Sequence, residues 1–533
     1  MWIKSVYKDY SLYNKNSLNN FLTFTSGKIN FATIHNLKSQ LSYSFKIIVM
    51  KKIQFFIFFC MHTYLVSAQK NIDSISVKQD FKIFENILKK GHPSLYEYIS
   101  NDSLENILKT TKESLKMVTS DIELYKKMVY LTDKIKDGHL LLSLPNTIKT
   151  EQYYFPLILK LINTEFYVDT DDFEIPIGSK INQINGMETS TILEALKKYI
   201  PSDGYNLTRK YRELELKFGL YFAYEYGIQK KFDINYTEPN GVKKNSILAS
   251  ESFTKVRHRN TKRNSYFAKF HKKENGFDYF DEFINKKEPF VYYKDEINTA
   301  VLVVNSFGED IRIFKSKLTK IFQEIQKKKI HHLVIDVRHN EGGFRPNAVH
   351  LYSFITDTIF KQRTSEYIAT LTIPERKYIT RTYFNEKEFL KDRFNNHPVY
   401  DGWELKFDDM ETIMVPNKNR FKGKVYVLTS GSTFSAGSTF VLNAKNNPNI
   451  MVIGEETGGG YYFHTGELPV LYEFPNSKII MTMFIEKISH HILDNTVSKG
   501  SGILPDKNIF LSREDLISGT DPELDYIFRW IKG

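Results

Sequence analysis

The sequence predicts a layered α/β fold with a helical N-terminal region, and three patterns carry this prediction. Residues 69–150 place apolar side chains mainly at helical spacing, whereas residues 151–250 alternate short apolar strands with turns. Residues 297–515 contain successive strand–helix–strand units. Such units build a layered core, because the crossover helices pack against the sheet that their strands form. A chain of 533 residues is long enough for several such regions.

The composition is that of an ordinary globular protein, with 41% hydrophobic and 26% charged residues. The formal net charge is +12, but lysines and acidic residues are mixed along the chain. We therefore expect a solvated charged surface and no nucleic-acid partner. Cys60 is the single cysteine, so an intrachain disulfide is excluded.

The first residues indicate processing. Residues 1–49 are polar and without a sustained period, and we interpret them as a wrongly included upstream extension. Residues 50–68 indicate a secretory signal peptide, with a basic start, the apolar run Ile53–Cys60 and the small residues Val66-Ser-Ala68. The run is too short for a membrane span, and a buried apolar helix is the alternative. We expect a periplasmic or secreted mature protein that starts at Gln69 and has no stable membrane span.

Residues 69–150 predict a helical region that ends at a flexible turn. Apolar side chains recur at helical spacing at Phe81, Phe84, Ile87, Leu88, Leu124, Met128, Leu131 and Ile135. This spacing puts the apolar side chains of each helix on one face. The pattern breaks at Asp137-Gly-His139, and Leu140–Leu144 predicts a strand.

The region at 151–250 contains the segment Ile175–Gly186, in which a glycine turn, an alternating strand and an Asn-Gly turn indicate a hairpin. We expect a helix at Thr191–Tyr199. Residues 251–296 include the basic run Arg257–Arg263. This composition predicts a solvated loop, with an interdomain linker or a mobile flap over a cleft as the functional alternative.

Residues 297–515 predict the α/β core, and residues 516–533 a C-terminal helix. The core shows buried strands at Ala300–Val304, Leu333–Val337, Val425–Thr429 and Ile450–Ile453, and an amphipathic helix at Ile311–Ile325. The second and fourth of these strands lead into the glycine-containing turns Arg338–Gly343 and Gly454–Gly460. Glycine lets backbone approach a ligand closely.

Ser435 follows the third strand, after the polar turn Ser430–Thr433, where a helix begins. The first N–H groups of a helix lack intrahelical partners, and the helix dipole is positive there. A hydroxyl at this place can be a simple N-cap. It can also be a nucleophile whose developing oxyanion meets free N–H groups. This stretch alone leaves both interpretations open.

Acyl transfer by serine also needs a base and N–H donors for the oxyanion. The amides of Gly342 and Gly343, with that of Ala436, can form an oxyanion hole, although the glycines can equally form an ordinary tight turn. His139 is the candidate base, with a structural histidine as the alternative. An unperturbed histidine, with a pKa of about 6.5, predicts a rate that rises through roughly pH 6–7.

Five segments in order resemble motifs of the C-terminal processing (tail-specific) serine peptidases. The matching segments are Asp137-Gly-His139, Leu333–Gly343, Thr433-Phe-Ser-Ala-Gly437, Gly454-Glu-Glu-Thr-Gly458 and Gly502-Ile-Leu-Pro-Asp506. The resemblance is to the histidine-using branch, related to tricorn core protease and interphotoreceptor retinoid-binding protein. Each motif is weak alone, but their order and spacing agree over roughly residues 75–515.

The resemblance implies a crotonase-like (ClpP/crotonase-type) layered core and a PDZ-like insert at residues 151–250. It also implies hydrolysis of protein or peptide substrates, often near their C-termini. The site residues that it implies are Ser435 as nucleophile, His139 as general base, and Gly342, Gly343 and Ala436 as oxyanion donors.

Two departures from the family pattern concern the base and its orienting acid. One branch uses a Ser–Lys dyad, but the place of its lysine holds Gly458-Gly-Gly460 here, and the next lysine is Lys478. A lysine base is therefore not expected. Where tricorn carries a glutamate this chain has Lys499. The orienting acid is left unassigned, with Glu486 and Asp494 as nearby candidates.

A second class of function stays open on the sequence. The missing acid favours a catalytically silent peptide- or lipophile-binding protein on the same scaffold, whereas Ser435 and His139 together favour an exported serine endopeptidase. Neither interpretation implies a metal or cofactor, because the chain has no His-Glu-x-x-His pattern and no cysteine ligand set.

Overall fold

The structure is a computed structural model that describes residues 71–145, 154–256, 261–271, 277–384, 386–399, 401–406 and 413–533. The expected upstream extension at 1–49 and the expected signal peptide at 50–68 lie outside these residues. Within the described part of the chain, no helix has both the length and the apolar character needed to cross a membrane.

The region before the α/β core is helical. It consists of α3 (Ser74–Gly91), α4 (Asn101–Ser114), the 3-10 turn η2 (Leu115–Met117) and α5 (Asp121–Ile135). The α-helices begin at caps, because the side chains of Asp73, Ser100 and Ser120 accept N–H groups of the first turn. α5 ends at Lys136, whose left-handed backbone (φ 60°) leads the chain into the turn that carries His139.

A mainly parallel sheet forms the centre of the α/β core. Its described strands, in spatial order, are β19 (Lys507–Asn508), β16 (Ile450–Gly454), β15 (Lys424–Thr429), β10 (His332–Asp336), β9 (Thr299–Val303) and β8 (Phe290–Lys294). β8 runs antiparallel to β9, and the other neighbours are parallel. The register aligns Asp336 with Leu428 and Leu428 with Ile453. β10, β15 and β16 therefore end at one edge, where the turns that follow them meet.

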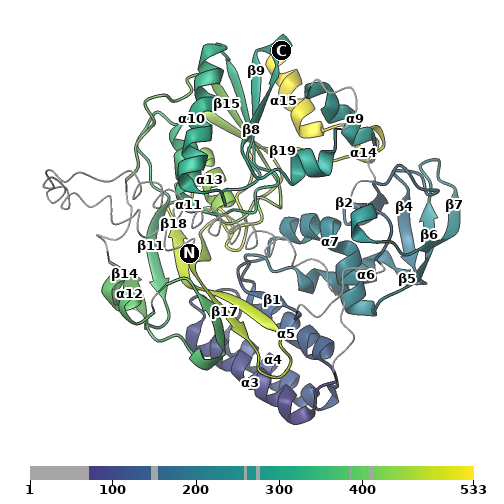
Figure 1. Cartoon of the computed structure of the whole chain (residues 1–533), viewed down its shortest axis with the longest axis vertical. Helices are drawn as coiled ribbons and strands as arrows, with labels where there is room; N and C mark the ends of the chain where they lie inside the picture. The colour runs from purple at the N-terminus through teal and green to yellow at the C-terminus, as the bar shows by residue number, and fades with distance from the viewer. Residues whose placement is uncertain are drawn as a thin grey trace, which may run out of the picture. The chain divides into compact units, whose positions relative to one another are not determined.

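Helices cover both faces of this sheet (Figure 1). Ala300 and Leu302 pack with α10 (Ile311–Lys327), α11 (Arg345–Ser353) and α13 (Ala436–Lys445). Val301 and Val303 pack on the other face with α9 (Thr261–Phe270) and α15 (Pro522–Lys532). Successive side chains of a strand point to opposite faces, which explains why β9 is buried along its whole length. The predicted mixed α/β class is confirmed.

Residues 251–296 differ from the expected solvated loop, linker or flap. Their described parts contain α8 (Phe253–Val256), α9, the π-helix η4 (Tyr279–Ile284), and η5 (Asp295–Ile297) after β8. Phe267 and Phe283 are fully buried in the same cluster as Val301 and Leu524. The aromatic residues within this basic sequence thus direct its packing, which the charge pattern did not reveal.

An antiparallel sheet adjoins the core. Its described strands, in spatial order, are β12 (Ile379–Thr382), β17 (Phe463–Glu473), β18 (Ile480–His490), β11 (Arg363–Ile368), β14 (Trp403–Leu405) and β13 (Phe394–Asn396). η6 (Arg376–Tyr378) precedes β12 and α12 (Glu386–Arg393) precedes β13. β1 (Leu141–Ser143) pairs with β18 and aligns Leu142 with Met481. This pairing anchors the segment directly after His139 on the core.

Residues 154–256 carry another antiparallel sheet. Its described strands are β2 (Leu159–Ile162), β3 (Glu165–Val168), β4 (Lys180–Ile184), β6 (Lys231–Thr237) and β7 (Lys243–Ala249), with β5 (Met187–Glu188) beside β4. Asn185 and Gly186 form the turn from β4 to β5, and their φ angles of 51° and 75° suit a type I′ hairpin. α6 (Thr189–Leu196) and η3 (Lys197–Tyr199) follow where a helix was expected.

α7 (Thr208–Tyr226) was not expected from the sequence. It buries Phe218 and Phe222, but it also buries the charged residues Lys210 and Glu213. A helix is recognised from a single apolar stripe, and burial on more than one face removes that signal. α7 starts beside the turn Ser430–Thr433, because a side chain at Gly431 would overlap the backbone of Thr208.

The C-terminal segment 516–533, expected to be one helix, contains the end of α14 (Arg513–Ser518) and all of α15. Gly519, with φ 72°, ends α14 in a left-handed cap. Asp521 then begins α15 by accepting the Leu524 N–H.

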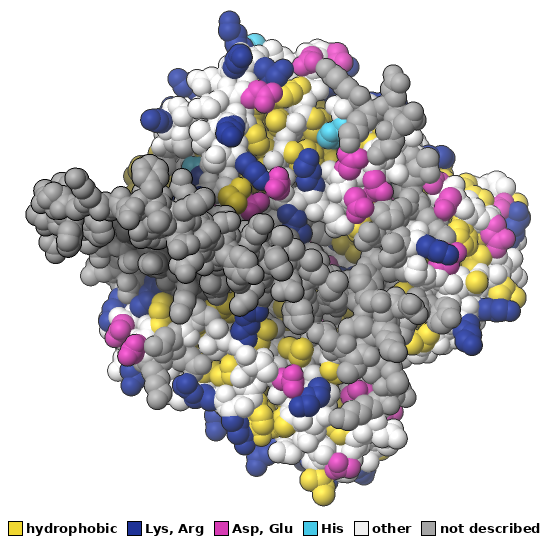
Figure 2. Space-filling view, in the orientation of Figure 1, with side chains coloured by type: hydrophobic (Ala, Val, Ile, Leu, Met, Phe, Trp, Pro, Cys, Tyr) yellow, Lys and Arg dark blue, Asp and Glu magenta, His cyan; other side chains and the backbone are white. Residues whose placement is uncertain are grey.

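Charged side chains of both signs are interspersed on the face shown in Figure 2. Surface ion pairs are part of this mixing, for example Lys89 with Glu105 (2.6 Å) and Lys317 with Glu288 (2.7 Å). The arrangement follows from the sequence, in which lysines and acidic residues are close neighbours.

Candidate active site

Ser435 lies in a strained turn between β15 and α13. Its φ of 53° and ψ of −126° form a conformation that residues other than glycine rarely adopt. In the described structure its hydroxyl makes no cap bond to α13. Oγ lies instead 3.0 Å from Nε2 of His139. The N-cap alternative therefore does not describe this serine, whose hydroxyl faces the ring of His139.

Hydrogen bonds hold the serine turn against the segment after β10. The Thr433 hydroxyl donates to Val337 O (2.8 Å). The Phe434 N–H donates to Asn340 O (2.9 Å). A strained backbone persists only where its surroundings hold it in place. These bonds on the preceding residues explain how Ser435 keeps its conformation.

His139 is buried beside the serine. Its ring stacks on Phe434, with the ring centroids 4.5 Å apart. Burial lowers the pKa of His139 to about 4; the charge of Asp137 opposes this effect and that of Arg209 adds to it. The ring is therefore uncharged at neutral pH, and Nε2 can accept the Ser435 proton. The acidic limb expected at pH 6–7 for an unperturbed histidine moves to lower pH.

Asp137 anchors the turn that carries the histidine. Its Oδ1 accepts the His139 N–H (2.8 Å) and the Thr465 hydroxyl (2.7 Å). Its Oδ2 lies 2.8 Å from His92 Nε2. His92 Nδ1 accepts the Ser94 N–H (3.2 Å), so Nε2 carries the ring proton and points it at Asp137. Burial alone would raise the pKa of Asp137, but the effects led by the His92 hydrogen bond outweigh it, and the pKa is lowered.

Gly342 fills a place beside Ser435 that no side chain can occupy. Its φ is 100°, and a Cβ there would lie 2.7 Å from the Ser435 Cβ. The Gly342 N–H donates to Asn340 Oδ1 (2.8 Å), and the Asn340 amide donates to Val304 O (2.8 Å). Among the expected oxyanion donors, Gly342 is thus the one whose N–H already has an acceptor.

Gly343 and Ala436 present the other two expected amides. Phe307 and Gly343 form a parallel β-bridge. The Phe307 N–H donates to Gly342 O, and the Phe344 N–H donates to Phe307 O. This pattern directs the Gly343 N–H away from Phe307. Ala436 is the first residue of α13, so its N–H has no partner within the helix.

The two lysines that the family comparison singled out are engaged elsewhere. Lys478 is exposed and pairs with Glu473 (3.1 Å) in the turn between β17 and β18. Lys499, which stands at the place of tricorn's glutamate, is also exposed and pairs with Glu97 (2.9 Å). Their ammonium groups are therefore held by surface carboxylates.

The acids considered for orienting the histidine do not bond to it in the described structure. Asp494 is exposed and accepts the N–H and the hydroxyl of Thr496. Glu486 is buried, and burial with the charge of Glu467 raises its pKa to about 8. His139 Nδ1 is buried and has no hydrogen-bond partner among the described residues.

Asp203, which no sequence motif marked, completes a cluster with Asp137 and His139. One side-chain ligand atom from each lies within 4.8 Å of the other two. The two Asp203 oxygens accept the N–H groups of Gly138 (2.8 Å) and Gly460 (3.1 Å). Because N–H and O–H donors already use the oxygens of both carboxylates, we interpret the cluster as hydrogen-bonded and not as a metal centre.

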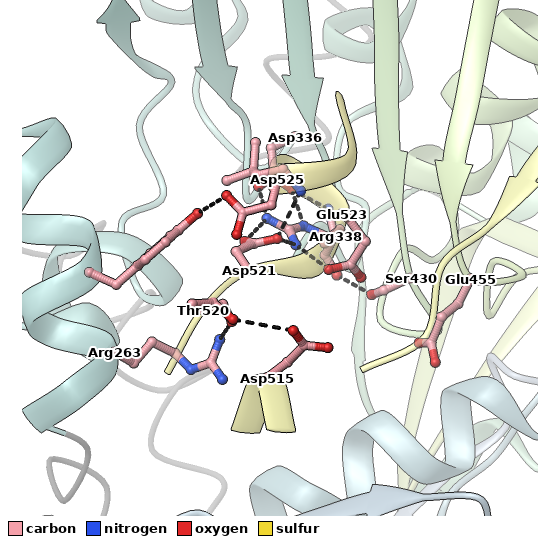
Figure 3. A network of polar contacts seen from close by, with 12 residues as sticks. Arg263, Asp336, Arg338, Ser430, Glu455, Asp515, Thr520, Asp521, Glu523 and Asp525 are labelled. Atoms are coloured by element: carbon pink, nitrogen blue, oxygen red, sulfur yellow. Dashed lines mark hydrogen bonds and ion pairs between the residues drawn. The ribbon is translucent and has the colours of Figure 1, made fainter. Parts of the chain in front are cut away.

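A buried ionic network supports the turn after β10 from the side of α15 (Figure 3). The Arg338 guanidinium bonds Asp336 and Asp521 at 2.7 Å each. It also contacts Glu523 at 3.1 Å. The Arg338 carbonyl accepts the Ser430 hydroxyl (2.5 Å). One arginine thus connects the turn before Gly342, the turn at Ser430 and the C-terminal helix.

A comparison with protein families matches residues 298–508 to peptidase family S41. This segment of the chain therefore carries the family's peptidase core. The matched segment contains the glycine turn and Ser435, whereas His139 and Asp203 precede it. The enzyme class is accordingly that of a serine-type peptidase. A comparison with curated protein sequences gave no match.

Solved structures share the fold at low sequence identity. Mature CPAF complexed with lactacystin aligns over 86% of this chain and 98% of that chain, at 12% identity and a TM-score of 0.58. Mature CPAF without this ligand aligns over 86% of this chain and 97% of that chain, at 12% identity and a TM-score of 0.58. The photosystem II D1 C-terminal processing protease aligns over 85% of this chain and 97% of that chain, at 12% identity and a TM-score of 0.38. The likeness to CPAF shows a common fold over most of the peptidase chain, including regions outside the family segment.

Proposed function

We propose that this peptidase is an exported endopeptidase of the C-terminal processing type, in which Ser435 is the nucleophile and His139 the general base. The observation that carries the proposal is the 3.0 Å distance between Ser435 Oγ and His139 Nε2, at a serine held with φ 53°. A serine hydroxyl is a weak nucleophile until a neighbouring base takes its proton. The uncharged imidazole of His139 can act as this base, which supports the histidine-using branch.

The first chemical step transfers the acyl group to the serine. Ser435 Oγ bonds to the carbonyl carbon of the scissile peptide while its proton moves to His139 Nε2. The carbonyl oxygen becomes an oxyanion, and the N–H groups of Gly343 and Ala436 stabilise it. Gly342 is the third expected donor, and its contribution is to leave room for the serine, because its N–H donates to Asn340.

The imidazolium then completes the reaction. It gives its proton to the leaving amine as the C–N bond breaks, and water hydrolyses the acyl-enzyme by the reverse sequence of proton transfers. The ionised Asp137 lies beside this imidazolium and favours its formation, because opposite charges stabilise each other strongly in a buried site.

The remaining parts of the proposal concern fold subtype, substrate and location. The parallel sheet with helices on both faces supports a crotonase-like core. The antiparallel sheet of residues 154–256 with α6 supports a PDZ-like domain, which would take a peptide tail as an added strand and so direct cleavage to protein C-termini. The signal-like pattern at 50–68 supports export to the periplasm or medium.

One observation favours the second candidate, a catalytically silent peptide- or lipophile-binding protein. His139 Nδ1 has no hydrogen-bond partner among the described residues. A base without an orienting acid is weaker, because its ring and tautomer are less well fixed.

Covalent labelling of the protein starting at Gln69 with a fluorophosphonate separates the two candidates. We expect labelling at Ser435, its complete loss in Ser435→Ala, and a loss of at least ~100-fold in the labelling rate in His139→Gln, since general-base catalysis contributes 10²–10⁴-fold. Ser432→Ala, a change to a buried serine of the same turn, is the matched control and keeps its labelling. Lys478→Ala stays within ~10-fold of wild type, a barrier change under about 1.4 kcal/mol. A folded wild-type protein that does not label would establish the binding protein instead.

A further inference from the structure

Asp203 joins the turn that carries His139 to the Gly-rich turn after β16. It lies in the connection between η3 and α7 and is buried. Its Oδ1 accepts the Gly138 N–H (2.8 Å), and its Oδ2 accepts the Gly460 N–H (3.1 Å). Gly138 directly precedes His139. One carboxylate therefore holds the base segment against a turn that is distant in the sequence.

Backbone contacts fix Asp203 at this position. The Gly204 N–H donates to Lys136 O (3.0 Å), and the Tyr205 N–H donates to Gly500 O (2.8 Å). Gly204 has φ 63°, and a Cβ there would lie 2.4 Å from the Gly500 Cα. The connection is thus packed between two segments and has no room to shift.

Close packing links Asp203 to the imidazole of His139. A Cβ on Gly138 would lie 2.6 Å from the Phe434 ring and 2.8 Å from Asp203 Oδ1, so Gly138 fills the space between them. Phe434 stacks on His139 on one side. The Arg209 guanidinium lies 3.6 Å from the centre of the Phe434 ring. A displaced Asp203 would therefore displace the segment that sets the ring of His139.

We propose that Asp203 is a positioning residue for His139. It acts through the Gly138 amide to hold the imidazole at Ser435, and it supplies a second carboxylate near the imidazolium that forms during the reaction. The proposal rests on the proposed function. It goes beyond it by assigning the missing partner of the base to the connection before α7 and not to the segment near Lys499.

Charge at Asp203 is coupled to charge at Asp137. Two buried carboxylates this close cannot both ionise without cost. Asp137 has the better donors, His92 and Thr465, and is the anion of the pair. Burial, and next the charge of Asp137, raise the pKa of Asp203 to about 7.

Few other ionisable groups face Asp203 from the described elements around it. Tyr98, before α4, and Lys136, after α5, line a small pocket with Asp203 and Asp137. Arg209 of α7 lowers the pKa of Asp203, against the larger effects of burial and Asp137. The segments at Gly460 and Gly500 contribute backbone groups at these contacts.

Ionisation of Asp203 should speed the reaction of Ser435. A second negative charge near His139 stabilises the imidazolium, so the proton leaves Ser435 more easily. We expect two rises in the labelling rate of the wild type as pH increases, one near pH 4 from His139 and one near pH 7 from Asp203.

The test compares Asp203→Asn with Asp494→Asn in the mature full chain. The readout is the rate constant for fluorophosphonate labelling of Ser435, measured on both sides of about pH 7. On the alkaline side we expect Asp203→Asn to lose about tenfold or more. On the acidic side, where the wild-type Asp203 is also uncharged, we expect a loss under ~3-fold. Asp494→Asn, which removes an exposed carboxylate, follows the wild type at every pH.

A loss in Asp203→Asn that is equal at every pH, or no loss, would overturn the proposal, because a purely structural role does not change with pH. Should Asp203→Asn fail to fold, the pH dependence of labelling is compared between the wild type and Glu486→Gln. Glu486 is another buried carboxyl whose pKa is raised, to about 8. A rise near pH 7 that persists in Glu486→Gln supports the proposal, and a profile that is flat there contradicts it. Failure of the proposed function gives a different result, since the folded wild type would then not label at Ser435 at any pH.

Discussion

Burial lowers the pKa of His139 to about 4, whereas burial and the charge of Asp137 raise the pKa of Asp203 to about 7. The unperturbed pKa values have the opposite order, because histidine titrates at about 6.5 and aspartate at about 3.9. Near neutral pH the histidine of this site is therefore always uncharged, and the aspartate is the group that titrates. The environment of each residue, and not its type, decides which one responds to pH.

At the residue scale, two glycines with similar φ angles allow backbone strain to be distinguished from side-chain overlap. Gly342 has φ 100° and leaves 2.7 Å between an added Cβ and Ser435, whereas Gly241 has φ 88° and no described atom within 4 Å. An alanine strains either backbone by roughly 1–2 kcal/mol. We expect Gly241→Ala to lose about this much stability to denaturant, and Gly342→Ala to lose more, because its Cβ also overlaps Ser435. Only Gly342→Ala should also lose labelling of Ser435, by ~100-fold or more, because it moves the nucleophile.

Equal labelling of Gly342→Ala and Gly241→Ala would show that the contact with Ser435 is unimportant. The stability measurement is the control in this comparison, because it shows whether Gly342→Ala is still folded when its labelling is measured.

At the scale of elements, β10 and α15 depend on each other through Arg338. Its guanidinium bonds Asp336, at the end of β10, and Asp521, at the start of α15, and all three side chains are buried. Removing one partner of a buried ion pair costs more than a surface pair contributes, because the charge that remains has neither water nor a partner.

We predict that Arg338→Ala lowers the free energy of unfolding by about 3–5 kcal/mol. Arg312→Ala is the matched control: its side chain is 79% exposed beside Asp310, so we expect a change within about 0.5 kcal/mol. Urea unfolding followed by tryptophan fluorescence measures both. A loss below ~1 kcal/mol in Arg338→Ala would mean that its carboxylates find other partners.

At the scale of the whole molecule, the site is assembled from separate regions of the chain. The helical region brings His139, and the connection before α7 brings Asp203. The core brings Ser435 and the glycine turn. The strand pair β1–β18 and the parallel register of β10 and β15 place these segments next to each other. Loss of any one of these packing contacts would therefore change how His139 and Ser435 lie relative to each other.

Buried carboxylates with raised pKa values make the stability of the molecule depend on pH. Glu486, on β18, has an ordinary pKa of 4.5 and a folded-state pKa of about 8, owing first to burial and then to Glu467. Between these values the unfolded chain releases the proton and the folded chain keeps it. Stability therefore falls as pH rises from 4.5 to about 8 and levels off above.

We predict that Glu486→Gln removes this dependence. Its Tm relative to wild type should rise by at least ~1 °C from the acidic to the alkaline end of that range, as expected for about 1 kcal/mol in a chain of this size. Glu194→Gln, at an exposed glutamate paired with Lys197, serves as the control and keeps a constant difference. A Glu486→Gln variant whose Tm difference falls with rising pH would contradict the sign of the shift.

Local patterns in the sequence determined the elements that depend on neighbouring residues. The apolar spacing at Phe81 and Leu124 lies in α3 and α5. The predicted strand at Leu333–Val337 lies on β10, and the one at Val425–Thr429 on β15. Periodicity and turn chemistry are local properties, which is why they are legible without the fold. Order along the chain was also enough to select Ser435 and His139 as candidates.

Only the tertiary structure decided what depends on contacts between distant residues. The antiparallel sheet around β18, the helix α7 and the packing of Phe267 escaped the sequence patterns, because long-range pairing and burial stabilise them. Asp203 was missed for the same reason, since its partners Gly138 and Gly460 are remote in sequence. The pKa values follow from burial and from charges that only folding brings together. Residue type and spacing suggested a serine and a histidine, and the fold decided that they meet and which acid lies beside them.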